Sequence, residues 1–367
     1  MIIKNINALG LFGGASLNAV ELALINTDGV DVYDYMKTAM VPYPEKLALE
    51  IRTILNRRTP DYAGLEKDKQ VQQLKNAVSR FYADIIKEFA TGETVDVIGI
   101  DGLTIGNSPQ NQCSYQLEDG HIVADVLQRQ VITHFHKADL LSGGQASPLA
   151  PIFFSALGQN CEKPALFIDL ETVCGLVYVG ASGELVAFDA APALALIEDW
   201  TFRHANMQTD YNGRLAITGQ VHPQIVEAML HHKILQKQPP KSLDMMCFAD
   251  KREHLEGLSL EDGAATVTAF VAEAIFQAAL DFLPKIPSHI YVGGEGLKNP
   301  SLMRFLKQSF APREIKTVND LVPNLRALGA CVTAYNAARR LYALPITFPS
   351  TTGVSEPITG GEFYEKS

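Results

Sequence analysis

A turn of small residues near the N-terminus has the composition of an anion-binding loop. Gly13, Gly14 and Ser16 separate two apolar runs, which is the pattern of a β-hairpin. Backbone N–H groups at such a tip can surround a phosphate, because glycine lets the main chain approach an anion closely. A tight hairpin that needs glycine only for its conformation is the alternative. The sequence therefore predicts either a phosphate contact or a purely structural turn.

Two expected strand ends carry polar side chains. Asp101 follows the apolar run 95–100, and α/β proteins place ligand groups at the carboxyl ends of buried strands. His134 and His136 alternate along a segment that we expect to be a strand, so both should face one side and contact a ligand. With Asp139 they could instead form a metal site, or they could be two ordinary polar histidines. No third strong ligand is evident, so we expect no metal site.

Two more polar residues stand at expected turns. Asp189 comes directly after an apolar strand, where its carboxylate could take a proton from a hydroxyl or from water. Alternatively, Asp189 caps the helix that we expect to begin at Pro192. Gln145 ends the run Gly143-Gly144-Gln145, which bends the chain with or without a ligand. We treat Gln145 as a candidate substrate contact.

The strands and helices that we expect around these residues indicate an α/β fold with two related halves. Apolar alternation predicts two three-strand meanders, each followed by helices. The expected strands are 3–12, 20–26, 30–37, 95–100, 131–135, 165–169, 175–179, 184–188 and 289–292. The expected helices are 44–56, 65–90, 192–207, 222–235, 261–283 and 320–342.

Composition narrows the class of protein. The chain has 367 residues, of which 47% are hydrophobic, so two domains around a central cleft are expected. No signal peptide or membrane span is expected. The five cysteines are dispersed, which indicates reduced thiols in a cytoplasmic protein. The net charge of −10 without a basic cluster argues against a nucleic-acid partner.

Several longer motifs occur in one order along nearly the whole chain. They include Gly10-Leu-Phe-Gly-Gly-Ala-Ser-Leu-Asn-Ala-Val-Glu21, Ile98-Gly-Ile-Asp-Gly-Leu-Thr-Ile105, Tyr115-Gln-Leu-Glu-Asp119, Asp139-Leu-Leu-Ser-Gly-Gly-Gln-Ala-Ser-Pro-Leu149 and Phe188-Asp-Ala-Ala-Pro192. In this order they resemble the anhydro-N-acetylmuramic acid kinases, a bacterial sugar-kinase family of the actin/hexokinase/Hsp70 superfamily. The Tyr115 motif, for example, is similar to the family's Gln-x-Gly-Asp.

The resemblance implies a fold, a reaction and a set of roles. It implies two actin/hexokinase-like (ribonuclease H-like) domains, the first over 1–125 plus 336–367 and the second over 126–335. It implies phosphorylation of 1,6-anhydro-N-acetylmuramic acid in peptidoglycan recycling, with ATP and Mg²⁺, and a possible homodimer. The implied roles are a catalytic base at Asp189, cofactor contacts at Gly13, Gly14, Ser16, Gly293 and Gly294, and substrate contacts at Asp101, His134, His136 and Gln145.

The departures from the family pattern fall on positions that should do chemistry. The first loop has Ala15 for Thr and Asn18 for Asp. The family's His is Asp101, and its Asp-Phe-Arg is His134-Phe135-His136. Its second phosphate loop, Asn-x-Gly-Gly-x-x-Asn, is Asp169-Leu-Glu-Thr-Val-Cys-Gly175. Behind Asp189, the family's Thr-Gly-Pro-Gly-Asn is Ala190-Ala-Pro-Ala-Leu194.

Side chains in place of two glycines restrict the backbone where a phosphate would approach it. We therefore expect a member of this family whose phosphotransfer is impaired. Three alternatives stay open: an active kinase, a non-catalytic binding or regulatory paralogue, and an enzyme with an altered substrate.

Overall fold

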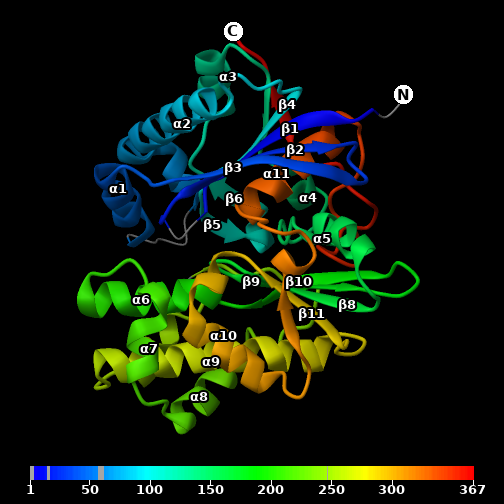
Figure 1. The fold of residues 1–367 in the computed structure, drawn as a ribbon. Helices are drawn as coiled ribbons and strands as arrows, with labels where there is room; N and C mark the ends of the chain where they lie inside the picture. Colours follow the sequence, from blue (N-terminus) through cyan, green and yellow to red (C-terminus); the bar gives the residue numbers. More distant parts are fainter. Residues whose placement is uncertain (1–3, 15–16, 57–61, 246) are drawn as a thin grey trace. The chain divides into compact units, whose positions relative to one another are not determined.

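The computed structural model of the protein describes residues 4–14, 17–56, 62–245 and 247–367 (Figure 1). The chain divides into two compact units. Unit 1 contains Met1–Ala156, Leu325–Pro349 and Val354–Ser367, and unit 2 contains Leu157–Asn324 and Ser350–Gly353. These units group residues 126–156 with the N-terminal sheet, whereas the sequence analysis assigned them to the second domain.

Unit 1 is built on a six-stranded mixed sheet in the order β13-β7-β4-β1-β2-β3. The first three strands form an antiparallel meander, which confirms the expected hairpin, and β1, β4 and β7 are parallel. Their carboxyl ends therefore lie at one edge of the sheet. The strands are β1 (Ile6–Phe12), β2 (Val20–Thr27), β3 (Val32–Val41), β4 (Val97–Asp101), β7 (Val131–Thr133) and β13 (Glu362–Tyr364).

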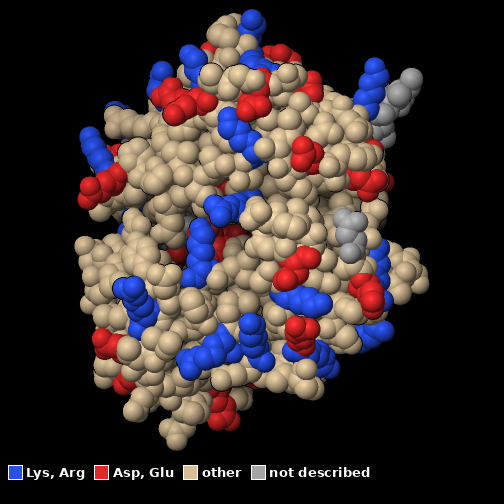
Figure 2. All heavy atoms as spheres, viewed as in Figure 1, with Lys and Arg blue, Asp and Glu red and all other residues tan. Residues whose placement is uncertain are grey.

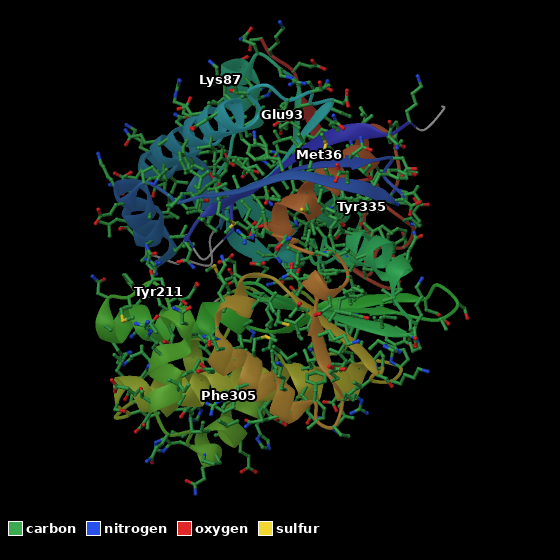
Figure 3. The ribbon with its side chains drawn as sticks, in the orientation of Figure 1. Met36, Lys87, Glu93, Tyr211, Phe305 and Tyr335 are labelled. Carbon is green, nitrogen blue, oxygen red and sulfur yellow. The ribbon has the colours of Figure 1, made fainter. Side chains whose placement is uncertain are left out.

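Helices and a small hairpin complete unit 1. Helix α11 packs on β1, β2 and β4. Its Tyr335 donates a hydrogen bond from Oη to the carbonyl oxygen of Val30 at 2.9 Å, which ties the helix to the loop before β3 (Figure 3). The remaining elements are α1 (Glu45–Asn56), α2 (Lys69–Phe89), β5 (Thr104–Ser108), β6 (Cys113–Gln116), α3 (Gly120–Leu127), α4 (Lys137–Leu141), α5 (Pro151–Leu157) and α11 (Leu328–Leu341).

Unit 2 is built on a five-stranded mixed sheet in the order β10-β9-β8-β11-β12. The strands β8, β9 and β10 form the second expected antiparallel meander, and β11 runs parallel to β8. Its strands are β8 (Ala165–Leu170), β9 (Cys174–Val179), β10 (Leu185–Ala191), β11 (His289–Gly293) and β12 (Ile315–Thr317). Its helices are α6 (Ala193–Ala205), α7 (Arg214–Thr218), α8 (Pro223–Leu230), α9 (Leu260–Phe282) and α10 (Pro300–Ser309).

The core of unit 2 lies on one face of this sheet. Leu166, Ile168 and Leu170 of β8 pack with Phe270 and Ile275 of α9 in one buried cluster. By length and composition α9 could cross a membrane, but most of its apolar window is buried inside the unit. Its hydrophobicity is therefore explained as core packing. Strand side chains alternate, so Asp169 lies on the opposite face of the sheet from this core.

The α/β class and both meanders agree with the expectations, whereas several boundaries do not. The strand expected over 131–135 ends at Thr133. The helix expected over 320–342 begins only at Leu328, because Asn324 and Ala327 have φ of 61° and 52° and break the helical path. The helix expected over 222–235 ends at Leu230. The hairpin β5–β6 and helix α10 were not expected.

Candidate active site

The polar residues of unit 1 gather at the carboxyl edge of its parallel strands. The backbone N–H of Gly13, after β1, donates to the carbonyl oxygen of Asp101, at the end of β4, at 2.8 Å. That N–H is therefore already bonded within the protein. Gly14 adopts φ of 53°, as a tight turn requires. Ser16, the third residue of the expected anion-binding turn, lies outside the described residues.

His136 forms an ion pair with Asp101 at this edge. Its Nδ1 lies 2.7 Å from the carbonyl oxygen of Ala146, and its Nε2 lies 3.3 Å from Oδ1 of Asp101. Since both partners are acceptors, this geometry assigns a proton to each ring nitrogen. Burial is the largest single effect and lowers the pKa of His136, but the Asp101 carboxylate, the hydrogen bond to Ala146 and the nearby Glu118 together raise it by more, so the net shift is upward.

Glu118 is buried beside this pair. Its Oε1 accepts a hydrogen bond from Oγ1 of Thr133 at 2.7 Å, and its Oε2 has no hydrogen-bond partner among the described residues. A Cβ at Gly102 would lie 1.8 Å from Oε2, so the carboxyl group fills the space that this glycine leaves. Burial raises the pKa of Glu118 to about 7; repulsion from Asp101 adds to this, and the Thr133 hydrogen bond opposes it.

His134 does not face the same side as His136, so that expectation was wrong. The strand ends at Thr133, and His134 turns away with φ of 54°. Its Nδ1 lies 2.8 Å from Oη of Tyr364 on β13. Burial lowers the pKa of His134 to about 4, so its ring is neutral. The structure thus keeps Asp101 and His136 together and gives His134 other neighbours.

Gln145 lies half-buried in the loop that holds His136. The carboxylate of Asp139 accepts the N–H of Ala146 at 2.7 Å, while its backbone carbonyl accepts the N–H of Gly144 at 2.9 Å. Asp139 therefore orders the loop on both sides of Gln145. Within the described ranges, no three His, Cys, Asp or Glu side chains are grouped as a metal site.

In unit 2, Asp189 lies near the end of β10 and is hydrogen-bonded on both its side chain and its backbone. Its Oδ2 accepts the N–H of Leu243 at 2.9 Å, and its own N–H donates to the carbonyl oxygen of Lys241 at 3.1 Å. Only 4% of Asp189 is exposed. Lys241 is fully buried, with Nζ donating to the carbonyl oxygen of Leu235 at 3.0 Å and lying 4.4 Å from the ring centre of Phe282. Burial lowers the pKa of Lys241 to about 8.

A second aspartate lies in register with Asp189, two strands away on the same sheet. Asp169 on β8 and Asp189 on β10 both pair with Gly175 on the strand between them. Residues in register across strands point to the same face, and glycine places no side chain between the two carboxyls. Burial, and then repulsion from Asp189, raise the pKa of Asp169 to about 7. Oδ1 of Asp169 has no hydrogen-bond partner among the described residues.

The side chain of Glu171 connects the loop after β8 to the loop after β11 by a hydrogen bond. Oε1 of Glu171 accepts the N–H of Glu295 at 3.2 Å, and a Cβ at Gly294 would lie 2.8 Å from the same oxygen. Gly294, with φ of 91°, therefore lies directly beside the Glu171 carboxylate.

The loop after β8 also accepts hydrogen bonds from the first residues of α6. The N–H of Leu194 donates to the carbonyl oxygen of Glu171 at 3.2 Å, and that of Ala195 donates to the carbonyl oxygen of Thr172 at 3.0 Å. Backbone N–H groups at a helix start commonly bind phosphates, but these already have partners. In this structure both N–H groups are bonded within unit 2.

Charged side chains are mixed over the face of the molecule that Figure 2 shows, with Lys and Arg next to Asp and Glu in each unit. This face therefore carries charges of both signs side by side.

Two mixed β-sheets, each covered by helices and each with polar residues near strand ends, define an α/β protein. A family model described as anhydro-N-acetylmuramic acid kinase matches residues 6–366. The chain is 35% identical to the anhydro-N-acetylmuramic acid kinase of Paramagnetospirillum magneticum, covering 97% of this chain and 99% of that protein. It is 34% identical to that of Zymomonas mobilis, with coverages of 97% and 99%. The chain belongs to the anhydro-N-acetylmuramic acid kinase family, as the resemblance of its sequence motifs indicated.

Solved structures with this fold are much less similar in sequence. A ROK family glucokinase from Streptomyces griseus, in complex with glucose and AMPPNP, is 13% identical with a TM-score of 0.42, covering 91% of this chain and 99% of that chain. The (R)-2-hydroxyglutaryl-CoA dehydratase component A of Acidaminococcus fermentans is 13% identical with a TM-score of 0.45, covering 92% and 99%. At these values neither bears on the function of this chain.

Two residues of the site were missed by the sequence analysis. One signal for Glu118 was present in the sequence, because it replaces the glycine of the Tyr115 motif. One signal for Asp169 was present too, because it replaces the first asparagine of the second phosphate loop. Glu118 is a single departure within a matching motif, whereas Asp169 stands in a loop in which every residue that the family pattern specifies differs. Their joint contacts depend on strand register, which one sequence does not specify.

Proposed function

We propose that this chain is a sugar-binding member of the family in which ATP-dependent phosphorylation of 1,6-anhydro-N-acetylmuramic acid is impaired. The proposal includes a role in bacterial peptidoglycan turnover, a cytoplasmic location and a possible homodimer without a nucleic-acid or membrane partner. The proposed site residues are those predicted from the sequence, with Asp189 as the remnant of the catalytic base and Asp101 and His136 on the sugar.

The Glu171 carboxylate carries this proposal. It stands where the family has a glycine, and it accepts the backbone N–H after Gly294 at 3.2 Å, as a phosphate oxygen would. A phosphate that binds there would have to displace the Glu171 carboxylate from this hydrogen bond. It would also be repelled by the negative charge of that carboxylate. Two unit charges about 4 Å apart repel by about 4 kcal/mol at an effective dielectric constant of about 20. ATP and Mg²⁺ are therefore doubtful cofactors here.

An active kinase is the second candidate, and the environment of Asp189 favours it. Asp189 is anchored by the Leu243 N–H at 2.9 Å, in the place the resemblance gives to the base. The carboxylate keeps an ordered geometry although the residues after it have lost their polar groups. If Glu171 moves when nucleotide arrives, this carboxylate could still accept a proton.

Release of ADP from Mg·ATP in the presence of 1,6-anhydro-N-acetylmuramic acid separates the two candidates. The wild type, Asp189→Asn and the double variant Glu171→Gly with Thr172→Gly are compared in a coupled assay. Impairment predicts that the wild type equals the Asp189→Asn background. Turnover of the wild type at least tenfold above that background, with formation of the sugar phosphate, would establish the active kinase instead.

A further inference from the structure

The side chain of Lys241 is fully buried although it ends in an ammonium group. Its Nζ lies 4.4 Å from the ring centre of Phe282 and 5.6 Å from that of Phe188, and it donates a hydrogen bond to the carbonyl oxygen of Leu235 at 3.0 Å. Two aromatic faces and a carbonyl oxygen replace water only in part. Unit 2 therefore keeps this charge in its interior at a cost in free energy.

The backbone of segment 241–243 runs along the outer side of β10, which is the edge strand of its sheet. The N–H of Asp189 donates to the carbonyl oxygen of Lys241 at 3.1 Å. Two residues later along this segment, the N–H of Leu243 donates to Oδ2 of Asp189 at 2.9 Å. One short segment therefore holds both the backbone and the carboxylate of Asp189, and the side chain of its first residue is enclosed by Phe188 and Phe282.

Charged and titratable groups from several elements act on Lys241. Burial is the largest effect and lowers its pKa to about 8. Asp189 on β10 opposes this most strongly, Asp281 on α9 and Cys247 add to that opposition, and Lys237 acts in the same direction as burial. Opposite charges attract strongly in a protein interior, and the attraction acts on both partners. The Lys241 ammonium therefore favours a negatively charged Asp189.

We propose that Lys241 is a positioning residue for Asp189, which holds segment 241–243 against β10 with its enclosed side chain and favours the carboxylate form of Asp189 with its positive charge. This inference rests on the proposed role of Asp189 as the remnant of the catalytic base. A base must be ionised and correctly oriented to accept a proton. The ammonium also opposes the repulsion between Asp189 and Asp169.

A double-mutant cycle on the full-length protein without ligand tests this proposal. Lys241→Met keeps an unbranched side chain and removes its charge, and it is introduced into the wild type and into the Asp189→Asn variant. At pH 6.5 we expect Lys241→Met to lower the melting temperature by about 2–4 °C more in the wild type than in the Asp189→Asn background. At pH 9.5 this difference should vanish, because Lys241 is then neutral in both backgrounds.

Two further variants separate the charge from the packing. Lys285→Met is the matched control, because it removes an exposed lysine of the same unit and should show no dependence on Asp189 at either pH. Lys241→Arg keeps a positive charge at both pH values, so its advantage over Lys241→Met should still depend on Asp189 at pH 9.5. If Lys241→Met does not fold, Lys241→Gln supplies the uncharged side chain for the same cycle.

Equal effects of Lys241→Met in the two backgrounds at pH 6.5 would overturn the proposal. A difference that persists unchanged at pH 9.5 would overturn it too, because a purely structural anchor does not depend on pH. This readout needs neither nucleotide nor turnover. ADP release by the wild type well above background would refute the proposed impairment and leave this inference intact, whereas loss of the coupling would refute this inference alone.

Discussion

Glu171 and Glu295 are joined by a hydrogen bond of 3.2 Å from the backbone N–H of Glu295 to Oε1 of Glu171. This contact links the carboxyl ends of β8 and β11, which are neighbouring parallel strands. In an α/β sheet that edge is where ligands approach. Here the side chain of Glu171 occupies that edge. The replacement of a family glycine by Glu171 therefore also explains why the loop after β8 is bonded to the loop after β11.

Gly294 should be intolerant of a side chain. It adopts φ of 91°, and a Cβ would lie 2.6 Å from the carbonyl oxygen of Leu170 and 2.8 Å from Oε1 of Glu171. We expect Gly294→Ala to lower the free energy of unfolding by about 2–4 kcal/mol, as measured by urea denaturation. Gly257→Ala is the control, because Gly257 has φ of 83° with nothing within 4 Å. Equal losses in the two variants would show that crowding by Glu171 has no part.

Glu118 should make the stability of the protein depend on pH. Its pKa is raised from 4.5 in the unfolded chain to about 7 in the folded one, mainly by burial. The folded state therefore holds the proton more tightly, and stability is lost as the pH rises from about 4.5 to about 7. The loss is on the order of 3 kcal/mol at most.

Glu118→Gln should flatten this part of the profile of unfolding free energy against pH and be more stable than the wild type above pH 7. Asp101 and Lys75 act on Glu118, and Glu118 in turn raises the pKa of His136, so the difference between the two profiles measures the Glu118 carboxyl together with its effect on His136. A profile unchanged by the substitution would contradict the assigned burial of this carboxyl.

Asp169→Asn should relieve the repulsion within the aspartate pair. The pKa of Asp169 is raised from 3.8 to about 7, first by burial and then by Asp189. Stability is thus lost as the pH rises from about 3.8 to about 7, and the amide variant removes that loss. The melting temperature at pH 8 should rise. An unchanged melting temperature at pH 8 would contradict a buried Asp169 carboxylate that is further destabilised by Asp189.

The sequence predicted the two meanders because alternating apolar residues and turn residues are local signals. It also placed Asp101 at the end of a strand, where the structure has it, whereas Asp189, expected just after a strand, lies inside β10 because that strand continues to Ala191. It misjudged His134, because the short strand β7 stops at Thr133 and the next residue takes a positive φ. The position of Glu118 could not be predicted, since its side chain, from the segment after β6, packs against Gly102 at the end of β4. Such contacts depend on packing between segments distant in the sequence.

The most direct test of the account is calorimetry of Mg·AMPPNP binding to the wild type and to the Glu171→Gly, Thr172→Gly double variant. Removing both side chains frees the Glu295 N–H and restores flexible main chain in the β8–β9 loop. The account predicts no measurable heat for the wild type, and binding by the double variant at least about tenfold tighter. Binding of the nucleotide by the wild type with an affinity equal to that of the double variant would contradict it.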